Sequence, residues 1–328
     1  MVERLKELIN IEKNPRKGLM AFEWIVLAYA AITTLFILYA FRQLPYPQEL
    51  LMGRLRIVGV IALMWLVYRL APCRLTLLTR VAAQMVLLSW WYPDTYELNR
   101  ILPNCDHLFA QMDQTIFGCQ PALLFSHLMP WHWFSELMDL GYASYFPMIL
   151  FIELYYFFVR YDQFEKASTV LITSFFIYYL IFVFLPVTGP QYYYLSIDAN
   201  DFVAGVFPPV GDYFNMHADH IVSPGWEDGL FYHLVEDAHQ AGERPTAAFP
   251  SSHVGITVVI LLLAWHAHSR RQWLFLLLLP FAVLMLFATV YIQAHYFVDV
   301  VSGLLSGVLF YYVLMYSYKT TTNEETIY

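Results

Sequence analysis

Two histidines lie in short polar breaks between apolar segments of the chain. His253 occurs in Phe-Pro-Ser-Ser-His-Val-Gly, and His295 in Ala-His-Tyr-Phe-Val-Asp, which ends at Asp299. One imidazole can attack a phosphoryl group while a second protonates the departing oxygen. Asp299 follows His295 by one helical turn, where a carboxylate would hold the imidazole in one tautomer. This pattern predicts phosphoryl transfer at a membrane, with His295, His253 and Asp299 as catalytic residues.

The composition places these residues in a membrane protein. Of 328 residues, 59% are hydrophobic and only 13% are charged, which excludes an ordinary soluble domain. Eight apolar runs approach the roughly 20 residues that a spanning helix requires. These runs cover residues 20–41, 55–70, 75–92, 139–159, 168–187, 252–268, 273–290 and 295–318. The sequence therefore predicts an all-α polytopic membrane helix bundle of about eight spans.

The positions of lysine and arginine predict how the bundle is oriented. Thirteen of the eighteen basic residues lie near the termini or around the connections that follow even-numbered spans. They are Arg4, Lys6, Lys13, Arg16, Lys17, Arg69, Arg74, Arg80, Arg160, Lys166, Arg270, Arg271 and Lys319. By the positive-inside rule, residues 1–19 and 319–328 are cytoplasmic tails and the two histidines face the extracytoplasmic side. Two or three spans then occupy residues 20–98.

The long predicted outer loop, residues 188–250, is strongly acidic. It holds nine of the twenty-six acidic residues and a single basic one, Arg244. Its length exceeds that of a simple connector, and loops of this kind usually carry function. The acidic surface argues against a nucleic-acid partner. The loop also holds histidines without metal-ligand spacing, so no metal or other cofactor is predicted; they are His217, His220, His233 and His239.

A second non-spanning region, residues 99–136, is rich in aromatic residues and suits a segment at the level of the lipid headgroups. It contains Cys105 and Cys119. These two cysteines could form a disulfide in an oxidising compartment, or remain free thiols. The predicted outer loops contain no Asn-X-Ser/Thr sequence, which favours a bacterial inner membrane over a Golgi lumen.

Five short motifs follow one another along the last two thirds of the chain. They are residues 113–121 (Asp-Gln-Thr-Ile-Phe-Gly-Cys-Gln-Pro), residues 142–147 (Tyr-Ala-Ser-Tyr-Phe-Pro), residues 185–191 (Leu-Pro-Val-Thr-Gly-Pro-Gln) and the two histidine motifs. In this order they resemble the inositol phosphorylceramide synthases, a branch of the type-2 phosphatidic acid phosphatase superfamily. The resemblance covers residues 108–318 and six of the eight spans. It implies a six-helix catalytic membrane domain, which we assign to residues 99–318.

The resemblance also implies roles and a reaction. His295 would be the nucleophile that forms a phosphohistidine, Asp299 its orienting partner and His253 the acid that protonates the departing alkoxide. The implied reaction moves phosphoinositol from a phosphatidylinositol-like donor to a ceramide-like lipid alcohol. Phosphatases of the superfamily carry an arginine six residues before the nucleophile, where this chain has Thr289. The transferase branch lacks that arginine as well.

Two other functions remain open at this point. The first is a lipid phosphate or polyprenyl diphosphate phosphatase, in which water resolves the same intermediate. The second is a non-enzymatic transporter, which would place charged or broken helices near the middle of the membrane. The polar motifs of this chain lie at helix ends instead, which favours an enzyme.

Several further residues are candidates for binding the substrate. Ser251 and Ser252 open a helix, whose free N–H groups and positive dipole end favour a phosphate. Arg244 could supply the missing positive charge, or be a solvated loop residue. Gln191 and Tyr192 could contact the headgroup hydroxyls or the phosphate, or belong to the aromatic belt of a membrane protein.

Overall fold

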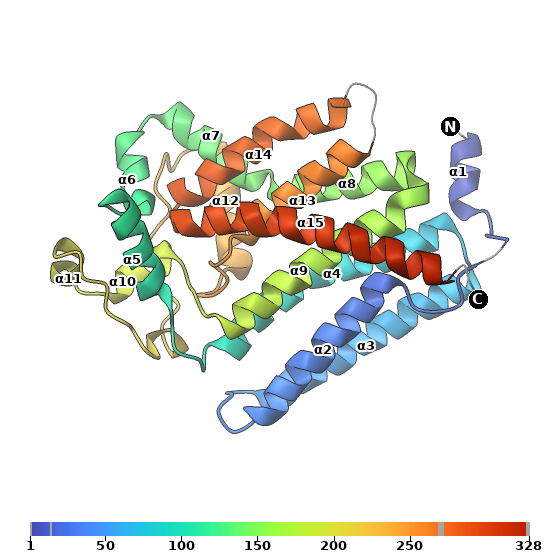
Figure 1. The fold of residues 1–328 in the computed structure, drawn as a ribbon, viewed down its shortest axis with the longest axis horizontal. Helices are drawn as coiled ribbons and strands as arrows, with labels where there is room; N and C mark the ends of the chain where they lie inside the picture. Colours follow the sequence, from blue (N-terminus) through green and yellow to red (C-terminus); the bar gives the residue numbers. More distant parts are fainter. Residues whose placement is uncertain (1, 14, 268–271, 326–328) are drawn as a thin grey trace.

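The computed structural model describes residues 2–13, 15–267 and 272–325, and all regular structure within these ranges is helical (Figure 1). In chain order the helices are α1 (Val2–Ile9), α2 (Ala21–Tyr39), α3 (Pro47–Leu70), α4 (Arg74–Asn99), α5 (Asp106–Phe117), α6 (Pro121–Leu128), α7 (His132–Ala143), α8 (Tyr145–Val159), η1 (Tyr161–Gln163), α9 (Phe164–Phe184), α10 (Pro190–Ser196), α11 (Ala199–Val203), η2 (Tyr213–Asn215), α12 (Leu230–Gly242), α13 (Ser252–His266), α14 (Trp273–Tyr291) and α15 (Phe297–Glu325). The prediction of an all-α membrane bundle is confirmed.

Each of the eight predicted spans is helical, but the spans differ in kind. Among the described residues, five helical segments are long and apolar enough to cross a membrane: α2, α3, η1 with α9, α14, and the first part of α15. Helices α7 and α8 together form a possible sixth span, bent by 44° at its centre. Helix α13 is apolar but has only 15 residues. Helix α4 has 26 residues but contains Arg80, Gln84 and Asp94, which lower its apolar character.

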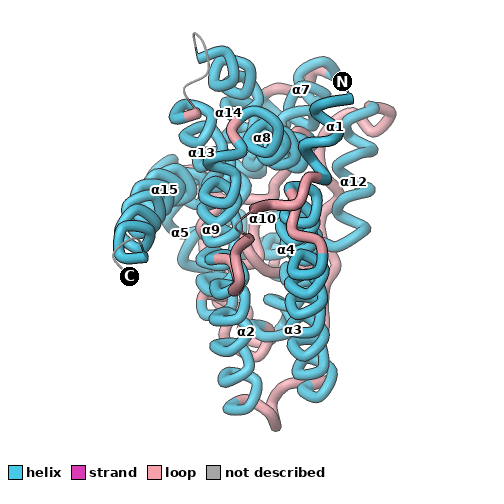
Figure 2. Tube along the Cα trace, turned by 90° about the vertical axis from the view of Figure 1, so that its right-hand side faces the viewer, coloured by secondary structure: helices cyan, strands magenta, loops and turns pink. Residues whose placement is uncertain are grey.

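Helix α9 forms the centre of the bundle. It packs against α2, α4, α8, α13 and α15, and 78% of its spanning window is buried, against 28% for α3 and α15. Helices α13, α14 and α15 lie together on one side of α9, whereas α2 and α3 form a hairpin that extends from the other side (Figures 1 and 2). The helices that carry the two histidine motifs are therefore supported by the most buried helix of the protein.

Two buried ion pairs connect the first three long helices. The Arg54 guanidinium on α3 binds both carboxylate oxygens of Asp94 on α4, at 2.7 and 2.6 Å. The Arg80 guanidinium on α4 binds both carboxylate oxygens of Glu23 on α2, and both side chains are fully buried. An unpaired charge within apolar helices is costly, so paired carboxylates allow these arginines to be buried. Arg80 thus lies inside a helix and does not mark a surface connection.

Helices α5 and α6 and the segment of residues 188–250 cover the end of the bundle at which α13 and α15 begin, which we call the histidine end. Helix α5 contacts α10 and α15, α6 contacts α14, and α12 packs on α7. In the region predicted to lie at headgroup level, Trp131 and Trp133 are more than half exposed, whereas Phe109 on α5 is buried in a small hydrophobic cluster; its depth in a membrane stays a prediction. The predicted long loop is partly helical and packs against the bundle.

Cys105 and Cys119 are free thiols. They flank the 12-residue helix α5, which separates them by roughly 18 Å at 1.5 Å per residue. A disulfide requires Cα atoms less than about 7 Å apart. The suggested bridge is therefore wrong. Of the predicted cytoplasmic residues, Arg270 and Arg271 lie outside the described residues, while α15 continues to Glu325 into the predicted C-terminal tail.

Candidate active site

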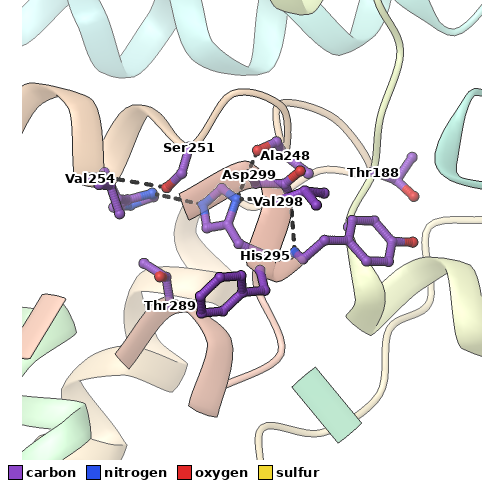
Figure 3. A network of polar contacts seen from close by, with 12 residues as sticks. Thr188, Ala248, Ser251, Val254, Thr289, His295, Val298 and Asp299 are labelled. Atoms are coloured by element: carbon purple, nitrogen blue, oxygen red, sulfur yellow. Dashed lines mark hydrogen bonds and ion pairs between the residues drawn. The ribbon is translucent and has the colours of Figure 1, made fainter. Parts of the chain in front are cut away.

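The start of α13 is fixed against the start of α15. The Ser251 side-chain oxygen accepts a hydrogen bond from the N–H of Val254 at 3.4 Å and caps the helix. The Ser251 N–H donates to the carbonyl oxygen of Asp299 at 3.1 Å (Figure 3). Ser251 and Ser252 are both buried. The first turn of α13, which holds His253, therefore keeps a defined position, and its dipole favours an anion.

His295 lies in the tight turn between α14 and α15. Its N–H donates to the carbonyl oxygen of Thr289 at 3.0 Å, and Gln293 adopts a left-handed conformation with φ of 66°. Gly189, at the start of α10, packs directly on this turn. Its φ is 96°, and a Cβ atom there would lie 2.5 Å from the Ala294 carbonyl oxygen. Only glycine permits this approach of the two backbones.

The two predicted histidines meet at the histidine end. Nε2 of His295 lies 3.5 Å from Nδ1 of His253, and the ring centroids are 5.7 Å apart. Nδ1 of His295 lies 2.8 Å from the Ala248 carbonyl oxygen (Figure 3). Because a carbonyl oxygen only accepts, Nδ1 carries the proton and Nε2 presents a lone pair. The structure thus brings together a nucleophilic nitrogen and a second imidazole.

Asp299, the predicted orienting partner, is not the nearest acceptor to His295. Its Oδ2 lies 3.6 Å from Nδ1 of His295, beyond ordinary hydrogen-bond length, and accepts from the Tyr296 N–H at 2.9 Å. The Ala248 carbonyl therefore fixes the tautomer, while the fully buried Asp299 carboxyl group lies beside the ring. Sequence patterns gave no indication of Ala248, because it acts through its backbone.

The surroundings of His295 keep its imidazole neutral. The side chain is 3% exposed. Burial lowers the pKa of His295 to about 4, although the hydrogen bond with Ala248 acts in the opposite direction. An imidazole with a pKa this low is unprotonated at physiological pH. The neutral ring with a free Nε2 is the form that can attack phosphorus.

Two tyrosine rings contact the ring of His253. Tyr142 stacks on His253 with centroids 4.7 Å apart and an interplanar angle of 29°, and Tyr145 lies at 4.5 Å. Both tyrosines come from the break between α7 and α8. The roles of these tyrosines were missed by the sequence analysis, although both belong to the motif of residues 142–147.

Two carboxylates of α5 position the turns around His295. Asp106 accepts from the N–H groups of Thr188 and Gly189, at 2.7 and 2.8 Å, and from the Tyr296 hydroxyl at 3.0 Å. Asp113 accepts from the N–H groups of Phe297 and Val298 at 2.8 and 3.1 Å, which are the first residues of α15. Helix α5 thus connects the α10 turn to the start of α15. Asp113 opens the first quoted motif, whereas Asp106 had no sequence signal.

Replacing Asp113 by alanine is expected to lower both stability and turnover. The substitution leaves two partly buried N–H groups at the start of α15 without an acceptor, and loss of a helix cap costs about 1–2 kcal/mol. We expect a lower unfolding temperature and about tenfold slower turnover, because a displaced reacting group readily costs this much. Thermal unfolding and turnover should be measured beside Asp219→Ala, which removes an exposed carboxylate. Unchanged values for both properties would show that Asp113 positions nothing.

Three of the predicted binding residues lie near the site, but their hydrogen-bond and ring partners are residues other than the two histidines. Arg244 is exposed, and its guanidinium donates to the Glu243 carbonyl oxygen at 2.8 Å. Gln191 and Tyr192 are buried; the Gln191 side chain donates to Glu243 Oε1 at 3.3 Å, and Tyr192 lies edge-on to His220. Within the part of the chain that the structure describes, no contact joins these three side chains to His253 or His295. Their roles in substrate binding stay predictions.

Comparison with known proteins gives the family. No curated protein and no solved structure matches the chain significantly. The family model described as the PAP2 superfamily matches residues 107–313, which include α5 from its second residue and both histidine motifs. The match covers more than half of the chain. The site of two facing histidines therefore lies in a member of the PAP2 superfamily, a family whose enzymes act on phosphate esters, and this protein belongs to it.

Proposed function

We propose that this protein is a membrane phosphotransferase that moves a phosphoinositol-type headgroup from a glycerophospholipid to a ceramide-like lipid alcohol. Membership of the PAP2 superfamily supports lipid phosphate chemistry of the phosphatase or phosphotransferase type. The observation that carries the proposal is the approach of His295 Nε2 to His253 Nδ1 at 3.5 Å, with His295 Nδ1 anchored on a carbonyl oxygen. Such a pair combines a nucleophile with an acid.

The proposed reaction has two steps. The lone pair of His295 Nε2 attacks phosphorus, the bond from phosphorus to the glycerol oxygen breaks, and His253 gives that oxygen a proton, which releases diacylglycerol. The acceptor hydroxyl then attacks the phosphohistidine. Its proton passes to His253, the phosphorus–nitrogen bond breaks, and both histidines return to their starting states. Backbone N–H groups in the first turn of α13 would stabilise the oxygens of the phosphoryl group.

Two features favour a transferase over the alternative phosphatase. Thr289 stands where the phosphatases of the superfamily carry an arginine. His295 is also buried, against the loop that carries Ala248, and burial limits the access of water to the intermediate. A lipid phosphate or polyprenyl diphosphate phosphatase would need water at this position. A transporter would not need a nucleophilic nitrogen of this kind.

The proposal includes a location for the reaction. The apolar helices support a multi-pass membrane protein. We propose that it resides in a bacterial inner membrane with the histidine end at the extracytoplasmic leaflet and both termini in the cytoplasm. Helix α1 and the far end of α15 lie on the same side of the bundle, away from α5 and α6, which supports this arrangement (Figure 1). Both lipid substrates would then enter sideways from the bilayer.

Product analysis tests the proposed function. Purified protein in liposomes is given phosphatidylinositol with a labelled headgroup, with and without ceramide. Label is expected in a ceramide product only when ceramide is present, with release of one diacylglycerol for each product formed. Release of water-soluble phosphate from simple lipid phosphates regardless of acceptor would identify a phosphatase instead. If neither a ceramide product nor free phosphate forms, the result would favour the transporter.

A further inference from the structure

A polar cluster without an assigned role lies on α12 and the residue that follows it. His239 is 3% exposed and lies between two carboxylates. Its Nδ1 is 3.7 Å from Glu236 Oε1, and its Nε2 is 3.6 Å from Glu243 Oε2. Both distances exceed ordinary hydrogen-bond length. The imidazole therefore lies in the electrostatic field of two carboxylates without a short hydrogen bond to either.

This cluster is adjacent to the histidine pair. The ring of His239 lies edge-on to Tyr142 with centroids 5.9 Å apart, and Tyr142 also contacts His253, with centroids 4.7 Å apart. Gln191 provides a second connection: its side chain donates to Glu243, and its N–H donates to the carbonyl oxygen of Gln293 in the turn that leads to His295. One aromatic ring and one glutamine thus separate the cluster from the reacting nitrogens.

Several buried polar atoms of this region have no hydrogen-bond partner among the described residues. They are His239 Nε2, Gln191 Oε1 and Gln293 Oε1. A buried polar atom without a partner is destabilising, so such atoms concentrated beside a reaction centre indicate that a ligand or water completes them. The histidine pair receives the phosphate, so the neighbouring cluster would face the group attached to that phosphate.

The chemistry of the cluster selects the kind of group that fits. Carboxylates accept hydrogen bonds, the imidazole donates, and an amide does both. Hydroxyl groups can form hydrogen bonds with the carboxylates, the imidazole and the amide, because each hydroxyl both donates and accepts. Burial lowers the pKa of His239, but the nearby carboxylates of Glu243 and Glu236 raise it overall. His220, 6.1 Å away, and Asp139 on α7 also face this ring.

We propose that His239, Glu243 and Gln191 form a binding site for the hydroxyl groups of a polyol headgroup. The site holds the headgroup of the donor lipid while its phosphate lies between His253 and His295, and in this respect it rests on the proposed function. Recognition of hydroxyls by charged groups makes the site selective against headgroups that lack them.

Calorimetric binding to the full-length protein in detergent tests this site without turnover. The probes are inositol 1-phosphate, inorganic phosphate and phosphocholine. We expect inositol 1-phosphate to bind at least about tenfold more tightly than the other two, because hydrogen bonds to charged groups are worth at least this factor. His239→Gln and Glu243→Gln should lose about tenfold for inositol 1-phosphate and leave inorganic phosphate within about twofold. His233→Gln and Asp237→Asn alter exposed residues of the same helix and should bind like wild type.

The charged variants could lose binding because they misfold, and Gln191→Met tests this alternative. It keeps the side-chain length and removes only the polar atoms. It should also lose the preference for inositol 1-phosphate. Equal affinity of the wild type for inositol 1-phosphate and inorganic phosphate, tighter binding of phosphocholine, or a full preference retained in all three variants would overturn the site. Binding is measured without ceramide, so failure to form a ceramide product refutes the transferase and not the polyol site.

Discussion

His295→Gln is expected to reduce the rate of the proposed headgroup transfer by about 10⁴-fold or more, since it removes the proposed nucleophile on which both steps depend. Glutamine can keep a hydrogen bond to the Ala248 carbonyl oxygen, but it has no nitrogen lone pair to replace Nε2. The measurement is the initial rate of labelled product formation in liposomes, together with trapping of the acid-labile phosphorylated protein by rapid denaturation at alkaline pH. Neither product nor phosphorylated protein should form.

His266→Gln is the matched control for this substitution. Nδ1 of His266 also lies 2.9 Å from a backbone carbonyl oxygen, that of Leu262, but at the far end of α13. We expect wild-type rates from this variant. His253→Gln should cost about 10²–10⁴-fold with a lipid donor. With a nitrophenyl leaving group, which needs no proton, it should recover most of the first step. Activity of His295→Gln within tenfold of wild type would refute the phosphohistidine.

Gly303→Val is expected to lower turnover by about 100-fold or more in a protein that still folds, because it forces apart the helices that carry the two histidines. A Cβ atom at Gly303 would lie 2.6 Å from the Ser251 carbonyl oxygen, and one at Gly307 would lie 2.5 Å from the Gly255 carbonyl oxygen. Both oxygens belong to backbone, so only a shift of the helices relieves the clash. That shift would widen the 3.5 Å separation of the imidazole nitrogens.

The size of the inserted side chain provides a graded test of this packing. Gly303→Ala and Gly307→Ala should give smaller losses of turnover than valine at the same positions. Gly59→Ala on α3 is the matched control, because no atom lies within 4 Å of its added Cβ. Turnover should be compared with elution volume and unfolding temperature for each variant. Wild-type turnover in a folded Gly303→Val protein would show that helix spacing does not set the site.

Much of this architecture could be predicted from local sequence patterns. Apolar runs identified the helices, because burial in a bilayer depends on composition over a whole segment. The pairing of His253 with His295 could also be anticipated, since each follows a polar break at the start of an apolar helix. The polar residues of α4 reduced the accuracy of span counting, because their ionic partners on α2 and α3 are recognised only once the helices are packed.

The contacts that refine the site depend on tertiary structure. The Ala248 carbonyl meets His295 because a loop remote in sequence folds across the α14–α15 turn, and a backbone oxygen has no residue type to recognise. Asp106 likewise gains its function only when α5 reaches the Thr188 and Gly189 amides. The packing of α12 on α7 brings His239 into contact with Tyr142. None of these tertiary contacts produces a local pattern in the sequence.

The two buried ion pairs also constrain how this protein enters a bilayer. Helix α4 carries one buried charge of each sign, Arg80 and Asp94, and their partners lie on the two preceding helices, in Glu23 on α2 and Arg54 on α3. None of these helices can partition into lipid alone without exposing an unneutralised charge. We therefore expect the first three long helices to enter the membrane together, and a chain truncated before α4 to leave Glu23 and Arg54 without these partners.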